Sequence, residues 1–122
     1  MNSGLSLSQI ALLAAYAVGM VGGQLLFKTA ALQLPGDGPL ATRLASLLQN
    51  GFFLGAVALY AALSVLWVWV LTFTPLSRAY PFVAIAFALT PLLGGLVFAE
   101  PLSARLLIGL AVIVGGLYLV AG

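Results

Sequence analysis

The distribution of charge is the feature that most constrains the fold of this chain. Residues 44–77 contain no charged side chain, and further charge-free runs occupy 1–27, 79–99 and 106–122. Charged residues make up 5% of the sequence and hydrophobic residues 64%, whereas a soluble domain has roughly 25% charged residues. So few charges cannot cover a surface in water, and each run approaches the roughly 20 apolar residues of a helical span. The sequence therefore predicts a membrane protein with four spans.

The predicted fold class is an all-α membrane protein, a four-helix transmembrane bundle that forms a single domain over residues 1–122. We expect the spans at about 7–27, 52–73, 80–98 and 106–120. The first apolar segment lacks the basic stretch that normally precedes a cleaved signal peptide. It is therefore interpreted as a retained span.

The segment between the first two spans predicts a short amphipathic helix. Residues 35–39 read PGDGP, a combination that breaks helices. Leucines then recur at spacings of four, three and one in residues 40–50, which places them on one helical face. Such a helix can lie in the headgroup region of the bilayer. The alternative is that it extends the second span out of the membrane.

Prolines and small residues predict details of the spans. Pro75 should end the second span, and Pro91 should kink the third and free a carbonyl one turn upstream. Glycine and alanine recur four residues apart, which allows close approach of helices in lipid. These pairs are Gly19 with Gly23, Gly51 with Gly55, Ala58 with Ala62, Ala84 with Ala88, and Ala111 with Gly115.

The basic residues predict the orientation of the chain in the membrane. Four spans would put Lys28, Arg43 and Arg105 on one side of the membrane and Arg78 on the other. Positive residues favour the cytoplasm, so both termini are expected outside it. With so small a margin, insertion in both orientations and antiparallel dimers stay open.

Composition excludes several classes of function. The sequence has no cysteine and no histidine, which removes disulfides, thiol chemistry and most zinc, haem or iron–sulfur sites. It contains no catalytic triad, no clustered carboxylates and no phosphate-binding glycine loop. We therefore expect no enzyme, no metal and no cofactor, and four cations do not indicate binding of nucleic acid.

The candidate binding residues are the few polar groups at the edges of the spans. Gln24 and Lys28 lie one helical turn apart and so face the same side. Gln24 suits a hydrogen bond between helices, and Lys28 either an interface anchor or a ligand for an anion. Glu100 is either a turn residue after the third span, in solvent or paired with Arg105, or a residue that meets Lys28 or a substrate cation.

Arg78 and Tyr80 are candidates at the other side of the membrane. Arg78 is suited to anchor the protein at lipid headgroups. Its planar guanidinium next to Tyr80 is also suited to bind a phosphate group.

Three stretches carry a resemblance to a known family. They are GGQLLFKTA at residues 22–30, PLSRAYPF at 75–82 and EPLSARLLIGLAVIVGGLYL at 100–119. The chain resembles the four-span branch of the drug/metabolite transporter superfamily, which is EamA-like and related to small multidrug resistance proteins. It is most similar to small subunits of undecaprenyl phosphate–aminoarabinose flippases, the ArnE and ArnF type.

The resemblance implies a membrane transporter subunit of the bacterial inner membrane. Its cargo would be a polyprenyl-phosphate glycolipid, moved between leaflets for modification of lipid A. It would work within membrane lipid as a homodimer, or as a heterodimer with a similar small subunit. The phosphate would meet Lys28 or Arg78, and the cation of an amino sugar would meet Glu100.

Two other functions stay open. One is a proton-coupled exporter of cationic compounds, although residues 1–27 hold no acidic residue of the kind that such a mechanism uses. The other is a membrane partner subunit that transports nothing itself.

Overall fold

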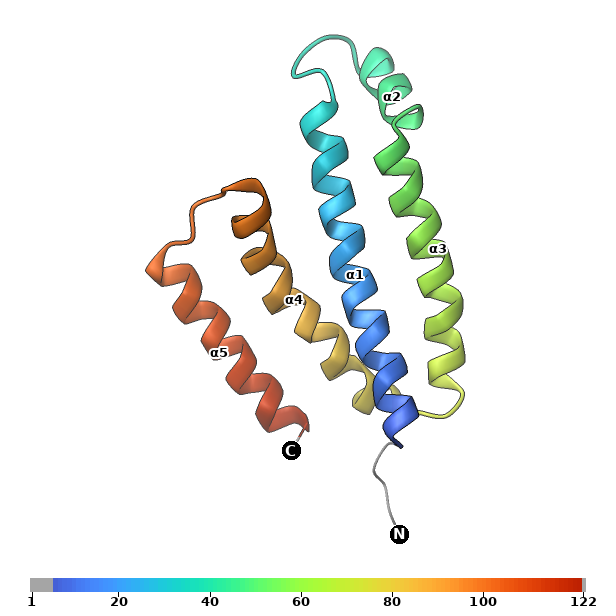
Figure 1. The fold of residues 1–122 in the computed structure, drawn as a ribbon, viewed down its shortest axis with the longest axis vertical. Coiled ribbons are helices and arrows are strands. Elements are labelled where there is room, and N and C mark those ends of the chain that lie inside the picture. Colours follow the sequence, from blue (N-terminus) through green and yellow to red (C-terminus); the bar gives the residue numbers. More distant parts are fainter. Residues whose placement is uncertain (1–5, 122) are drawn as a thin grey trace.

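A computed structural model describes residues 6–121, and within them it contains five helices and no strand (Figure 1). The helices are α1 (Leu7–Gln33), α2 (Leu40–Leu48), α3 (Gly51–Leu71), α4 (Leu76–Phe98) and α5 (Ala104–Ala121). This confirms the predicted all-α class.

Local sequence sets both ends of α1. At its start the Ser6 hydroxyl accepts a hydrogen bond from the Gln9 backbone N–H at 3.2 Å, and the Gln9 side chain accepts one from the Ser6 N–H at 2.9 Å. This reciprocal pair satisfies two donors at the helix N-terminus. The helix continues to Gln33, six residues beyond the predicted end of the first span. It stops where Leu34 takes an extended conformation, because Pro35 disfavours a helical residue before it.

The short helix predicted between the first two spans is confirmed as α2. Its leucines Leu40, Leu44 and Leu48 repeat every four residues and are all exposed. The helical conformation is interrupted between α2 and α3, since Asn50 is extended with φ −80° and ψ 123°. Therefore α2 is a separate helix and does not extend the second span.

Asn50 joins the start of α3 to the end of α1. Its side-chain oxygen accepts a hydrogen bond from the Phe53 N–H at 3.1 Å, and its amide donates to the Gln33 side chain at 2.9 Å. One side chain thus caps α3 and fixes the far end of α1.

We expect Asn50→Ala to lower the free energy of unfolding by about 1 kcal/mol, which is the usual cost of losing an N-terminal cap. Gln33→Ala removes the bond between helices but leaves the cap, so it should have a smaller effect. Titration of mixed micelles with sodium dodecyl sulfate, followed by circular dichroism, measures both variants. Equal losses would contradict a role for the cap.

Helix α1 occupies the centre of the arrangement. It packs against α3 on one side and α4 on the other, whereas α5 packs mainly on α4 (Figure 1). A buried cluster of Leu13, Val70 and Ala79 lies where the start of α1 meets the end of α3 and the start of α4. Beside it Trp67 stacks on Tyr16, with ring centres 4.9 Å apart.

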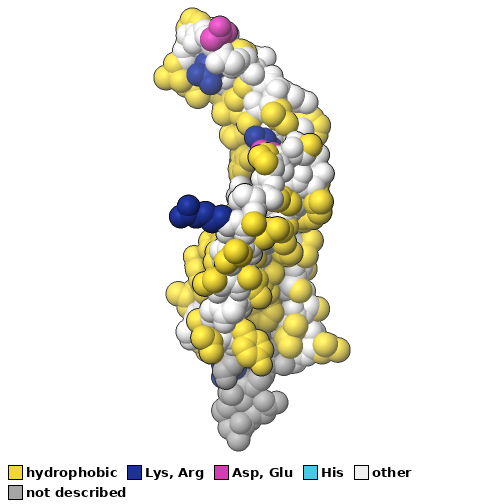
Figure 2. Space-filling model, turned by 90° about the vertical axis from the view of Figure 1, so that its left-hand side faces the viewer, with side chains coloured by type: hydrophobic (Ala, Val, Ile, Leu, Met, Phe, Trp, Pro, Cys, Tyr) yellow, Lys and Arg dark blue, Asp and Glu magenta, His cyan; other side chains and the backbone are white. Residues whose placement is uncertain are grey.

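The outer surface is that of a multi-pass membrane protein. Within residues 6–121, three helices are long and apolar enough to cross a bilayer, namely α1, α3 and α4. Figure 2 shows a face that is largely hydrophobic, with charged side chains in a few separate places. Helix α5 is also apolar but has 18 residues, about 27 Å of helix against a hydrocarbon core of about 30 Å. A fourth span through α5 therefore stays a prediction.

Only some of the small-residue pairs lie where helices approach each other. A methyl group added at Gly19 would come within 2.8 Å of Leu63, and one at Gly23 would overlap the ring of Tyr60. This pair therefore allows α3 to pack closely on α1, as predicted. In contrast, Gly51 and Gly55 have no atom within 4 Å of such a methyl group.

Candidate functional site

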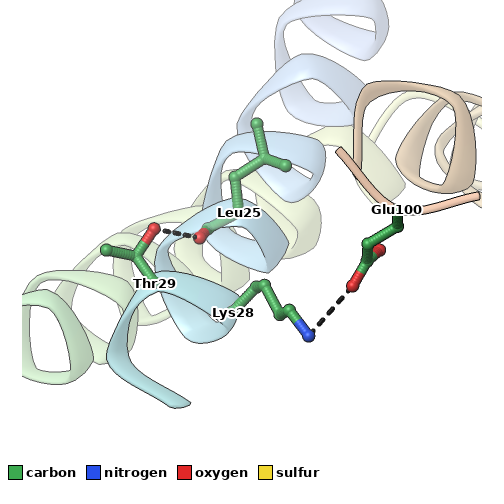
Figure 3. A network of polar contacts seen from close by, with 4 residues as sticks. All are labelled: Leu25, Lys28, Thr29 and Glu100. Atoms are coloured by element: carbon green, nitrogen blue, oxygen red, sulfur yellow. Dashed lines mark hydrogen bonds and ion pairs between the residues drawn. The ribbon is translucent and has the colours of Figure 1, made fainter. Parts of the chain in front are cut away.

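An ion pair joins α1 to the loop that follows α4. The Nζ atom of Lys28 lies 2.9 Å from an Oε atom of Glu100, and the two side chains are 40% and 45% exposed (Figure 3). Lys28 is therefore located inside α1, with five more helical residues after it, and not at the helix end as the predicted span implied. Of the two basic side chains that the sequence offered as partners for Glu100, Lys28 rather than Arg105 is the one that it contacts.

The end of α4 is built so that Glu100 can reach back toward α1. Ala99 takes a left-handed conformation with φ 54°, which reverses the chain as the C-terminal residue of many helices does. Two glycines leave room for the returning loop. A methyl group at Gly94 would lie 3.4 Å from the Glu100 carboxylate, and one at Gly95 would lie 2.5 Å from Leu102. Gly95 thus gives Leu102 the space to pack against α4, whereas a methyl group at Gly94 would be at an ordinary contact distance from Glu100. The sequence did not predict this role of Gly95.

Gln24 bonds to α3, one turn before Lys28 on α1. Its Nε2 atom donates to the Tyr60 hydroxyl at 2.8 Å, and that hydroxyl donates to the Met20 carbonyl at 2.9 Å. A tyrosine has one hydroxyl proton, and here Met20 receives it, so Tyr60 must accept from Gln24. The amide oxygen of Gln24 consequently points away from Tyr60. The prediction of a helix–helix hydrogen bond is met, but Tyr60 was not identified from the sequence.

Aromatic packing holds Tyr60 in place. Its ring stacks on Phe27 with centres 5.4 Å apart, and Gly23 lies directly against it. The sequence signal for this contact was the Gly19–Gly23 pair, which marked the face of α1 that a neighbouring helix would approach.

Arg78 and Tyr80 lie at the other end of α4. Arg78 is in the first turn of that helix, where its backbone N–H bonds the Pro75 carbonyl at 3.0 Å. The ring of Tyr80 meets Trp67 edge to face at 6.2 Å and is half exposed. The helix from Arg78 to Phe98 covers about 30 Å at about 1.5 Å per residue.

The candidate residues thus form two separate groups. One contains Gln24, Lys28 and Glu100, and the other contains Arg78 and Tyr80. A ligand headgroup can contact one group at a time, and the five residues do not make a single cluster. Among the described residues there is also no group of three or more acidic, histidine or cysteine side chains that could hold a metal ion.

Comparison of the chain with protein-family models, curated proteins and solved structures finds no match.

Proposed function

We propose that this protein is a membrane transporter subunit that moves a polyprenyl-phosphate-linked amino sugar across the bacterial inner membrane. The active unit is a homodimer or a heterodimer with a similar small subunit, and the product serves modification of lipid A and the envelope. The resemblance of residues 22–30, 75–82 and 100–119 to flippase subunits supports this proposal.

The observation that carries the proposal is the ion pair between Lys28 and Glu100. In a chain with only six charged residues, two of opposite sign meet at 2.9 Å at the edge of α1 and α4 while each remains about two-fifths exposed. A phosphate-linked amino sugar carries an anion and a cation. When the pair opens, the phosphate can bind Lys28 and the ammonium group can bind Glu100, so neither charge is left without a partner.

A second basic residue supports handling of phosphate at the opposite end of α4. Arg78 lies in the first turn of that helix, close to Tyr80 in sequence. The apolar tail needs no protein path, because the outer surfaces of the helices already face lipid. Only the headgroup has to travel between the region of Lys28 and that of Arg78.

The positions of the acidic residues support proton-coupled export of cations less well than they support the movement of a phosphate-linked amino sugar. The sequence has two acidic residues, Asp37 and Glu100, and both lie outside the helices. A carboxylate that both attracts a cation and takes up a proton is expected within a span. Glu100 is in addition already paired with Lys28.

Transport in liposomes tests the proposal. Purified protein is reconstituted with a polyprenyl phosphate that carries an amino sugar, and a membrane-impermeant reagent for amines reports how much sugar reaches the outer leaflet. We expect Lys28→Gln to slow the movement at least tenfold, because the uncharged amide loses the charge-assisted bond to phosphate.

Arg105→Gln is the matched control, since it removes one positive charge from an exposed residue at the start of α5. It should transport at the wild-type rate. A Lys28→Gln variant that transports normally would remove the proposed role of Lys28. Equal loss in both variants would indicate an effect of overall charge on insertion.

A further inference from the structure

A cavity of about 300 Å³ lies between α1 and α4, next to Gln24. Its lining residues come from the middle of both helices: Met20, Gln24, Ala86, Phe87, Thr90 and Pro91. This volume is at the lower end of the range for ligand sites. None of the lining side chains carries a charge, so the cavity differs in chemistry from the neighbouring Lys28–Glu100 pair.

Pro91 places a hydrogen-bond acceptor at the cavity. In a regular helix the N–H of residue 91 would bond the carbonyl of Phe87, but proline has no N–H to donate. Helix α4 nevertheless continues through Pro91 to Phe98. The Phe87 carbonyl thus lacks its usual helical donor, and a carbonyl within a membrane span needs another donor in its place.

Thr90 adds a second unmatched group. Two hydroxyl side chains in the middle of other helices bond a carbonyl of their own helix: Thr29 bonds Leu25 at 2.9 Å and Ser64 bonds Tyr60 at 2.8 Å. Thr90 makes no such bond with any described residue. Its hydroxyl remains available to a ligand in the cavity.

Gln24 supplies the third group. Because its Nε2 donates to Tyr60, its amide oxygen is directed elsewhere, and no described residue donates to it. The residues that line the cavity thus include two with an unmatched carbonyl-type acceptor, Gln24 and Phe87, and one with an unmatched hydroxyl, Thr90. Unmatched acceptors in hydrocarbon are costly, so the preferred occupant is a neutral group rich in O–H donors.

We propose that this cavity binds the hydroxyl groups of a carbohydrate headgroup on a membrane lipid. The inference rests on the proposed function and specifies how the sugar is held apart from the phosphate. A lipid-linked sugar is favoured over a free sugar, because the cavity opens at the level of spanning helices and is otherwise lined by apolar side chains. Such a headgroup arrives along the membrane with its tail still in lipid.

Binding of a phosphate-free glycolipid tests this inference independently of transport. Protein in nanodiscs is offered monoglucosyldiacylglycerol or plain diacylglycerol, and native mass spectrometry counts the lipid molecules retained. We expect preference for the glucosyl lipid. Thr90→Val should reduce the affinity about 3- to 10-fold, the effect of about one hydrogen bond, and Thr90→Ser should retain it. Pro91→Ala should also weaken binding, because it returns an N–H to the Phe87 carbonyl.

Thr29→Val is the matched control, since the hydroxyl that it removes is already bonded within α1 (Figure 3). It should bind like the wild type. Equal retention of both lipids, or equal effects of the two valine variants, would overturn the inference. Competition by soluble methyl glucoside as strong as by the glycolipid would overturn the choice of a lipid.

The two proposals fail in different ways. If the wild-type protein retains the glucosyl lipid in preference to diacylglycerol but Lys28→Gln transports normally, the carbohydrate site is supported and the role of Lys28 in binding phosphate is disproved. If Lys28→Gln stops transport but the wild-type protein retains both lipids equally, the role of Lys28 in binding phosphate is supported and the carbohydrate site is disproved.

Discussion

Gly23→Ala is expected to destabilise the protein by about 1–3 kcal/mol, the usual cost of overpacking a tight contact. The added methyl group would overlap the ring of Tyr60. That ring cannot simply turn aside, because it stacks on Phe27 and its hydroxyl bonds both Gln24 and the Met20 carbonyl. Helix α3 would have to move away from α1, and the Gln24 bond would be lost with it. Unfolding in mixed micelles, followed by circular dichroism, measures the loss.

Gly22→Ala provides a matched control at the adjacent position. A methyl group there meets no atom within 4 Å. Alanine is also the better helix former by about 0.5–1 kcal/mol, so this variant should be neutral or slightly more stable. The difference between the two variants isolates the contact with Tyr60. If both behaved alike, the close approach of α1 and α3 at this level would be disproved.

Reversing the charge of Lys28 is expected to have the largest effect on transport. Lys28→Glu places two carboxylates together and removes the cation proposed to bind phosphate, so we expect at least a 100-fold loss of movement. Glu100→Lys places two cations together and removes the proposed ligand for the ammonium group. Effects on stability should be small, because both side chains are about two-fifths exposed and exposed ion pairs contribute little.

The double variant Lys28→Glu/Glu100→Lys separates two roles of the pair. It restores an attraction between α1 and the loop after α4, but the negative charge now lies on α1 and the positive charge on the loop. If the pair only fastens the loop to α1, the double variant should transport normally. We expect the stability of the double variant to stay close to that of the wild type while its transport stays low, since the positions of the two charges must match the phosphate and the sugar. The liposome assay and thermal unfolding distinguish these results.

Much of the helical layout was predictable, because local residues set it. The PGDGP segment and the leucine spacing after it predicted α2, and Pro75 marked the turn before α4. The end of α1 was predicted too early, since Lys28 was treated as the boundary. A charged residue can lie inside a helix when its long side chain reaches a partner. The backbone instead stops at Leu34, where Pro35 imposes an extended conformation.

The candidate site was predictable only where residues share a helix. The four-residue spacing placed Gln24 and Lys28 on one side of α1, and it required no knowledge of other helices. The partner Tyr60 depends on the register between α1 and α3. The partner of Glu100 depends on a loop that folds back over Gly94 and Gly95. The Gly19–Gly23 spacing marks the face of α1 but not the residue of α3 that meets it, and the loop has no periodic signal in the sequence. These partners could therefore be found only in three dimensions.

The central position of α1 has a consequence for biosynthesis. Chains are made from the N-terminus at about 5–20 residues per second. Tyr60 is 36 residues beyond Gln24, so the ribosome adds it roughly 2–7 s later. Glu100 follows Lys28 by a still longer interval. The first helix to be synthesised is thus the one on which the other helices pack. Its side chains Gln24 and Lys28 remain without these partners for several seconds during synthesis.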